Sequence, residues 1–375
     1  MSKPVKALIT LALLAAFGAA LFFSFRGHEQ QRIEQQQTAE LAAVAPLAGL
    51  IALDVEPFFN DPRVQKILAA QRLPVKVTRV GSRDMAAKVV AGSTPDFFFP
   101  SGVVAANQIV DAARQANIGN AQFSPFYTPM VIASWEPIAQ ILVANGLARP
   151  MQPKVYGVDM AKLTEAMLAK KRWKDFKGAA AYDVSRSVLV STTDVRRSNS
   201  AAMYLALTSH ALNGDVVTDR ATAQQAARKL AELFKRQGYQ ENYVNGNFDD
   251  YVSIGIGKTP MAFIYENQLV SYALTKKGVA ADMVLLYPQP TIINKVVFVA
   301  TSERAKALGA LLSANAELQG IAVEYGFRIA DVDRFAQAVK PTGLAIEPRV
   351  SQVIDPPSAE IMTEMIDVVA KEMTQ

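Results

Sequence analysis

Short apolar runs alternate along most of the chain with longer amphipathic stretches of about 10–15 residues. The apolar runs have the length of buried strands, and the longer stretches carry apolar residues at helical spacing. This alternation predicts an α/β fold in which helices cover a largely parallel sheet. We expect strands at 47–53, 75–80, 96–99, 187–191, 261–265, 283–287 and 296–300, and helices at 61–71, 85–91, 103–116, 136–145, 161–170, 221–237, 316–325 and 358–373.

One strand-like segment, 123–134 (FSPFYTPMVIAS), differs from the others because it is long and contains two prolines. We interpret it as a strand that crosses from one lobe to another, and we expect the late strands to carry the chain back. The chain has 375 residues, which is enough for two domains. We predict that lobe I comprises 47–125 together with 290–375, and that lobe II comprises 126–289.

The N-terminus has the pattern of a membrane segment. Residues 7–25 are uncharged and mostly apolar, with lysines before them and an arginine after them. As a helix they would extend about 28 Å, which matches the hydrocarbon core of a bilayer. We predict a cytoplasmic end at 1–6, a transmembrane helix at 7–25 and a polar stem at 26–46, which makes a single-pass inner-membrane protein with its main part exported. A cleaved signal peptide is the alternative, although the bulky residues after the alanines disfavour cleavage.

Composition excludes several functional classes. Cysteine is absent, which removes disulfides, thiolate nucleophiles and cysteine-ligated zinc. The 2 histidines cannot form a histidine-centred triad or a multi-histidine metal site. We therefore predict no catalytic residue, no metal and no cofactor. The 39 Lys and Arg residues against 34 Asp and Glu residues give a mild excess of +5 without a basic cluster, so we predict no nucleic-acid binding.

Residues 191–204 (STTDVRRSNSAAMY) join a predicted strand to a helix through hydroxyl, amide and guanidinium groups. The first turn of a helix has unpaired backbone N–H groups and a partial positive charge, so such a junction is suited to hold an oxyanion. We select Arg197, Ser198, Asn199 and Ser200 as ligand contacts, with the guanidinium available for a bidentate contact to a carboxylate or phosphate. The structural alternative is a serine that only caps the helix, beside solvated arginines.

Two earlier turns between a strand and a helix have the same form. Ser82 and Arg83 follow the second predicted strand, and Ser101 and Gly102 follow the third. In an open α/β sheet the turns at the carboxyl ends of the strands lie together, and ligands bind there. We therefore add these four residues to the predicted site, although an ordinary capped turn explains either pair alone.

Four further residues are candidates for the same site. Glu56 follows the first strand and would require a ligand that carries a hydrogen-bond donor or a positive group. Tyr127 lies on the predicted crossing strand, and Tyr265 and Glu266 end the later strand in FIYENQ. Aromatic residues at strand ends often belong to the core instead, so the core is the alternative for both tyrosines.

The order of the segments FFNDPRVQKIL, GSRDMA, FSPFYTPMVIASW, VLVSTTDVRRSNSAAMYLAL and MAFIYENQ resembles that of the type II periplasmic, or extracellular, solute-binding proteins of ABC transporters. The resemblance implies two lobes joined by two crossing strands, a ligand in the cleft between them, and closure of the hinge on binding. Members for phosphate, sulfate and molybdate hold a dehydrated oxyanion with hydroxyl and main-chain N–H groups. The positions of Ser82, Ser101 and Ser198 match that use. The anchor and stem depart from the family pattern.

A small anionic ligand and an inner-membrane permease are the partners that this resemblance implies. Two other functions remain open from the sequence. A membrane-tethered sensor or assembly factor would use the same fold without transport. An enzyme would need an acid and a base in the cleft, and Glu56 with Glu266 is the pair that the sequence offers.

Overall fold

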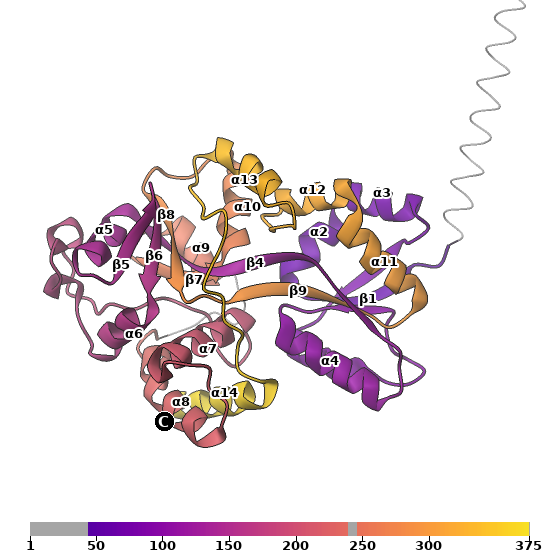
Figure 1. Ribbon diagram of the computed structural model, residues 1–375, viewed down its shortest axis with the longest axis horizontal. Helices are drawn as coiled ribbons and strands as arrows, with labels where there is room; N and C mark the ends of the chain where they lie inside the picture. The colour runs from indigo at the N-terminus through magenta and orange to yellow at the C-terminus, as the bar shows by residue number, and fades with distance from the viewer. Residues whose placement is uncertain (1–43, 239–245, 375) are drawn as a thin grey trace, which may run out of the picture.

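The computed structural model describes residues 44–238 and 246–374. Within these residues one sheet runs through the molecule in the order β2-β1-β3-β9-β4-β8-β6-β5, with β7 paired to β4. Its strands are β1 (Leu47–Ile51), β2 (Val75–Arg79), β3 (Phe97–Phe99), β4 (Ala121–Trp135), β5 (Ala148–Gln152), β6 (Val155–Asp159), β7 (Met261–Tyr265), β8 (Met283–Gln289) and β9 (Ile293–Ala300). The α/β class predicted from the sequence is confirmed (Figure 1). The prediction of a largely parallel sheet is wrong: β1 is parallel to β2 and β3, and β6 is parallel to β8, whereas the other strand pairs are antiparallel.

Helices cover both halves of the sheet (Figure 1). They are α2 (Glu56–Asn60), α3 (Pro62–Ala70), α4 (Val103–Gln115), α5 (Glu136–Ala144), α6 (Met160–Leu168), α7 (Asn199–Asn213), α8 (Arg220–Lys235), α9 (Gly246–Ser253), α10 (Glu266–Lys276), α11 (Glu303–Ala314), α12 (Ala316–Glu324), α13 (Val332–Val339) and α14 (Ala359–Met373). The sequence allows them to begin and end there because polar side chains cap several N-termini, as Asp61 does when its carboxylate accepts a hydrogen bond from the Arg63 amide at 2.8 Å.

The long strand β4 connects the two halves of the molecule. Its first part pairs with β9, from Ala121 opposite Ala300 to Pro129 opposite Ile293. From Met130 onwards it pairs with β7, and then also with β8. The prediction of a crossing strand is therefore confirmed. Below, the first lobe contains β1, β2, β3, β9 and the start of β4, and the second contains the rest of β4 with β5 to β8; the predicted domain boundaries at 125/126 and 289/290 stay a prediction.

Aromatic packing forms the core of the first lobe. The rings of Phe97 and Phe298, on the neighbouring strands β3 and β9, stack with their centroids 4.8 Å apart. Gly49 on β1 allows this arrangement, because a Cβ atom there would lie 2.0 Å from the Phe97 ring. Burial of such large apolar side chains supplies most of the driving force for folding this lobe. It also fixes the ends of β1 and β3, from which two of the predicted site turns begin.

Three local predictions differ from the structure. Residues 187–191 form no strand; only isolated bridges occur there, from Ser187 to Arg172 and from Ser191 to Ala262. The helix expected at 85–91 is replaced by short 3-10 turns at Ser82–Asp84 and Ala86–Lys88. The hairpin of β5 and β6 was not predicted. These segments are short, so their local pattern does not distinguish a strand from an extended loop that neighbouring elements hold in place.

The C-terminal helix α14 lies on the second lobe, although the sequence prediction placed residues 290–375 in the first. Figure 1 shows α14 beside α8 and below α7. Met365 and Val369 of α14 are fully buried in the same apolar core as Ala227 and Leu230 of α8. The apolar stripe of α8 needs a cover, and α14 provides it. This placement brings α14 to the opening between the lobes.

Candidate functional site

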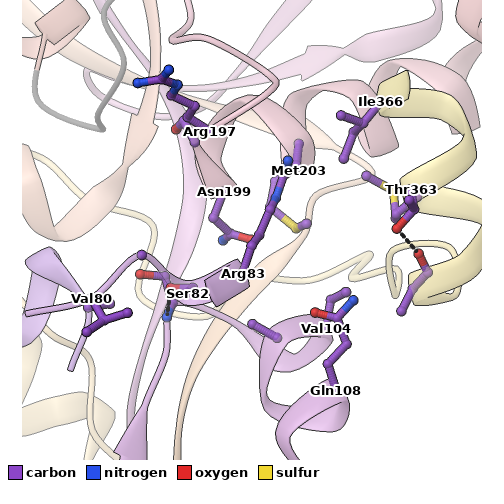
Figure 2. Close-up of a pocket in the computed structure, with 18 of the residues that line it drawn as sticks. Val80, Ser82, Arg83, Val104, Gln108, Arg197, Asn199, Met203, Thr363 and Ile366 are labelled. Carbon is purple, nitrogen blue, oxygen red and sulfur yellow. Dashed lines mark hydrogen bonds between the residues drawn. The ribbon is translucent and has the colours of Figure 1, made fainter. Parts of the chain in front are cut away.

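A cavity of about 840 Å³ lies between the two lobes. We call it the interlobe cleft. The first lobe contributes the segment after β2, Ser101 after β3, and α4; the second contributes the start of α7, and α14 closes one side (Figure 2). Its lining residues are Ala52, Leu53, Arg79, Val80, Gly81, Ser82, Arg83, Ser101, Val104, Ala105, Gln108, Arg197, Ser198, Asn199, Ala202, Met203, Ala359, Met362, Thr363, Ile366 and Asp367. Six of the predicted site residues are therefore brought together, from turns that are far apart in the sequence.

Three hydroxyl groups form a buried triangle where the loop enters α7. The Thr193 hydroxyl donates to Ser198 Oγ at 2.6 Å, and Ser200 Oγ lies 3.0 Å from Thr193 Oγ1 and 2.9 Å from Ser198 Oγ. The Ser198 side chain makes no capping hydrogen bond to the helix. Ser198 lines the cleft, whereas Ser200 lies behind it. The predicted contact through Ser200 is thus indirect, because its hydroxyl positions that of Ser198.

The two neighbouring arginines of this loop have different roles. The Arg196 guanidinium is paired with the buried Asp194 carboxylate at 2.5 Å. Burial raises the pKa of Asp194, but the hydrogen bonds from Arg196 lower this pKa by more than burial raises it. The pKa of Asp194 therefore lies below its ordinary value. Arg197 lines the cleft, at the edge away from Val104 and Gln108 (Figure 2). Of the pair, Arg197 is the arginine that the cleft can use, as the sequence prediction chose.

Arg83 connects the lobes directly. It lies in the turn after β2, and its guanidinium donates to the backbone carbonyls of Arg196 at 2.7 Å and Val195 at 3.0 Å, across the cleft. Burial lowers the pKa of Arg83, while Asp367 and Asp194 act in the opposite direction. Its donors are partly used by these bonds. Arg83 is therefore an interlobe clasp in this closed arrangement, and a role in ligand contact stays a prediction.

We expect Arg83→Met to open the unliganded protein. A hydrogen bond from a charged donor contributes about 1.5–3 kcal/mol, so losing the clasp should shift the equilibrium between closed and open lobes by roughly tenfold or more. Small-angle X-ray scattering should show a larger radius of gyration. Arg79→Met is the matched control, because Arg79 also lines the cleft but, among the described residues, pairs with Glu56 of the same lobe, at 3.3 Å. An unchanged radius for the Arg83 variant would contradict the clasp.

A chain of polar contacts forms the bottom of the cleft on the first-lobe side. The Ser101 amide donates to Ser82 Oγ at 2.9 Å, and the Ser101 hydroxyl donates to Asp54 Oδ1 at 2.6 Å. The second carboxylate oxygen, Asp54 Oδ2, is buried and has no hydrogen-bond partner among the described residues. Burial raises the pKa of Asp54, and the Ser101 hydrogen bond opposes this rise. Neither of the carboxylates that follow β1 lines the cleft. Asp54 contacts the lining residue Ser101, whereas the predicted Glu56 pairs with the lining residue Arg79, and a ligand contact through Glu56 stays a prediction.

A second set of polar groups, from the other lobe and from β9, lies next to these polar contacts. Gly102 has φ +93°, and a Cβ atom there would lie 2.7 Å from Asn294 Oδ1 and 3.2 Å from Asn199 Nδ2. Asn199 Nδ2 donates to the Tyr265 hydroxyl at 2.8 Å. Asn294 on β9 is 2% exposed, and neither atom of its amide has a partner among the described residues. Gly102 is thus required for close approach of these amides, and a contact between Gly102 and a ligand stays a prediction.

We refer to Asp54, Ser101, Asn199, Tyr265 and Asn294 as the polar floor. Ser101 and Asn199 line the cleft directly, and the other three lie against them. Burial raises the pKa of Tyr265, and the charge of Asp54 raises it further. Asp54 and Asn294 were missed as site residues by the sequence analysis. No local signal marks Asn294, because it lies inside a strand.

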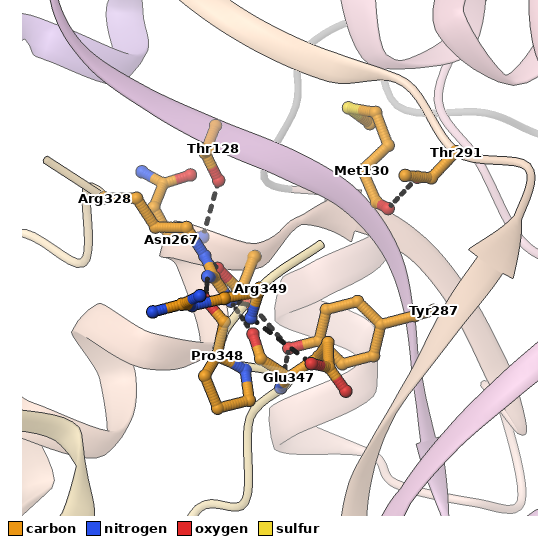
Figure 3. Close-up of polar contacts among 10 residues, drawn as sticks. Thr128, Met130, Asn267, Tyr287, Thr291, Arg328, Glu347, Pro348 and Arg349 are labelled. Atoms are coloured by element: carbon orange, nitrogen blue, oxygen red, sulfur yellow. Dashed lines mark hydrogen bonds and ion pairs between the residues drawn. The ribbon is translucent and has the colours of Figure 1, made fainter. Parts of the chain in front are cut away.

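Two further predicted site residues, Glu266 and Tyr127, are not among the residues that line the cleft. Both are hydrogen-bonded to Arg328, which Figure 3 shows with its neighbours. Glu266 is fully buried and forms a two-pronged ion pair with Arg328, whose Nη2 is 2.7 Å from Glu266 Oε1. Tyr127 forms backbone hydrogen bonds with Arg328 at 2.9 and 3.0 Å. Both belong to the support of the hinge. The predicted acid and base pair is not assembled, because Glu56 is bound to Arg79 and Glu266 to Arg328.

No protein-family model matches the sequence, and no curated protein matches it. Solved structures do share the fold. The periplasmic binding protein AfuA from Actinobacillus pleuropneumoniae, with fructose-6-phosphate bound, is 12% identical with a TM-score of 0.52, covering 88% of this chain and 98% of its own. The periplasmic binding protein P5PA is 12% identical with a TM-score of 0.51, covering 88% and 99%. The structure of an ABC transporter from Clostridium perfringens is 12% identical with a TM-score of 0.51, and the match covers 88% of this chain and 98% of that one.

The chain therefore has the two-lobed fold of the type II periplasmic binding proteins, and the resemblance seen in the sequence is confirmed at the level of the fold. The predicted location as a single-pass inner-membrane protein is corrected. The fold is that of periplasmic proteins, and no helix within 44–238 and 246–374 is long and apolar enough to cross a membrane. The predicted anchor at 7–25 and most of the stem at 26–46 lie outside the described residues.

Proposed function

We propose that this chain is a solute-binding protein that captures a small anionic ligand in the interlobe cleft and presents it to an ABC transporter. The observation that carries this proposal is the convergence of Ser82, Ser101 and Ser198, from turns of both lobes, on one cavity. Around them are buried polar atoms that have no hydrogen-bond partner within residues 44–238 and 246–374. Such atoms cost free energy in the unliganded protein, and a bound ligand would satisfy them.

The electrostatics of the rim support an anionic ligand. Three arginines and one aspartate line the cleft, so its lining carries net positive charge. Arg83 and Arg79 are engaged with other groups, whereas Arg197 has no ion-pair or side-chain hydrogen-bond partner among the described residues. Arg197 is therefore the guanidinium available to a carboxylate or phosphate. The described residues contain no cluster of three or more potential metal ligands, and we assign no residue a catalytic role.

A thermal-shift screen of the full chain against oxyanions, organic acids, sugar phosphates and amino acids tests this function. A ligand with a micromolar dissociation constant, present at millimolar concentration, should add about 4 kcal/mol to the free energy of unfolding. Arg197→Ala should reduce the shift and leave the melting temperature of the unliganded protein unchanged. Arg228→Ala is the control, because Arg228 is an exposed arginine on α8 outside the cleft. Absence of a shift with every class of compound would refute the proposal.

A further inference from the structure

One wall of the interlobe cleft is apolar. Met362 and Ile366 of α14 face the cleft beside Met203 of α7, and Val104 of α4 lies across from them (Figure 2). Ala105 and Ala202 complete this wall. An inorganic oxyanion has no group to place against it. Apolar surface of this kind is instead the usual complement of the hydrocarbon part of an organic ligand.

The size of the cleft points in the same direction. Its volume of about 840 Å³ lies in the range of pockets that hold organic ligands, roughly 300–1,000 Å³. A tetrahedral oxyanion has five heavy atoms and occupies the space of only a few water molecules, each of about 30 Å³. Most of this cleft would remain filled with water around such an ion.

The polar floor imposes a further requirement. Within the described part of the chain, Asp54 Oδ2 is a buried acceptor without a donor, and Asn294 presents both an unpartnered acceptor and an unpartnered donor. A fully ionised sulfate or molybdate has only acceptor atoms, so it leaves Asp54 Oδ2 and Asn294 Oδ1 unsatisfied. A hydroxyl or amino group satisfies them, because each of these groups donates hydrogen bonds. Of the arginines that line the cleft, Arg197 lies at its edge, away from Val104 and Gln108 (Figure 2).

Building on the proposed function, we propose that the ligand is an organic acid or ester anion with a hydroxyl or amino group for the polar floor and an apolar body for the α14 wall. Inorganic oxyanions are excluded as its ligands. The anionic group lies toward Arg197, the donor group lies at the polar floor, of which Ser101 and Asn199 line the cleft, and the hydrocarbon part packs on Met362 and Ile366.

Four matched series of compounds, measured by thermal shift and calorimetry on the full chain, test this assignment. They are 2-hydroxy carboxylates, 2-amino carboxylates and unsubstituted carboxylates of increasing chain length, and the ions sulfate, phosphate and molybdate. Affinity should rise roughly fourfold for each added methylene group in the hydroxy or the amino series. The unsubstituted acids should bind at least about tenfold more weakly, because the floor acceptors then remain unpaired. Comparison of the first two series identifies which donor the floor takes.

Two variants of α14 provide the internal control. Ile366→Thr removes apolar surface from the cleft and should flatten the dependence on chain length. Val368→Thr makes a similar change on the same helix outside the cleft lining and should leave that dependence intact. Tight binding of an inorganic oxyanion, or organic binding without dependence on chain length, overturns this inference and leaves the proposed function standing. A panel in which no compound binds overturns the inference too, and the wider screen described above then decides the function.

Discussion

Arg328→Leu should lower the free energy of unfolding by about 3–5 kcal/mol, because it leaves the Glu266 carboxylate buried without its counter-ion. Glu266 is 0% and Arg328 2% exposed. The guanidinium also donates to the carbonyl oxygens of Pro348 at 2.8 Å and Glu347 at 2.5 Å, so several elements depend on it. Burial lowers the pKa of Arg328, but the interactions with Glu266 raise it by more, so the guanidinium stays charged.

Urea unfolding of the variant measures this loss. The double variant Arg328→Leu with Glu266→Gln should recover part of it, since a buried amide costs less than a buried charge and still accepts from the Tyr287 hydroxyl. Arg220→Leu is the control, because it breaks the exposed pair of Arg220 with Glu360, for which a change of about 0–1 kcal/mol is expected. Equal effects of the Arg328 and Arg220 variants would contradict a structural role for the buried pair.

Asn294→Leu should have two opposite effects. The unliganded protein should become more stable, by about 1–3 kcal/mol, because leucine nearly keeps the volume of the side chain and removes a buried amide that has no partner in the described part of the chain. Ligand binding should weaken by about tenfold or more, because the polar floor loses a donor and an acceptor. A site that is strained for function is expected to show such a trade-off between stability and activity.

Asn247→Leu is the matched control for this variant. Asn247 is also buried, but its amide donates to the carbonyl oxygens of Ser191 at 3.2 Å and Phe263 at 2.9 Å. The same substitution there should lower the melting temperature. Thermal unfolding with and without ligand measures both proteins. A lower melting temperature for Asn294→Leu, together with unchanged affinity, would show that Asn294 serves the fold and not the ligand.

The sequence predicted those parts of the site that are built from short local patterns. A strand followed by a polar turn can be recognised within about ten residues, which is why Ser82, Ser101 and Ser198 were found. Their convergence follows from the rule that such turns share one edge of an α/β sheet. The loop at 191–200 was found through its composition, although the strand expected before it is absent.

The remaining site residues depend on contacts between distant parts of the chain. Asn294 is placed by its register opposite Thr128 on β4, which no local pattern encodes. Glu56 was chosen although Asp54 belongs to the site; the 3-10 turn after β1 and the partner Ser101 decide between them. For α14, the apolar face is visible in the sequence. The lobe that this face covers depends on the apolar stripe of α8, which α14 buries.

The change of partner along β4 has a mechanical consequence. The strand exchanges β9 for β7 between Pro129 and Met130, so a bend at this point leaves each ladder of hydrogen bonds intact. Next to this point, residues 291–292, which lead into β9, are hydrogen-bonded to β4. Met130 N donates to the Ile292 carbonyl at 2.9 Å, and the Thr291 hydroxyl donates to the Met130 carbonyl at 2.9 Å (Figure 3). The two connections between the lobes, β4 and the segment that returns to β9, are hydrogen-bonded side by side, so they can bend about one axis but resist twisting. When the lobes open and close again, the same residues of the two lobes should therefore face each other across the interlobe cleft.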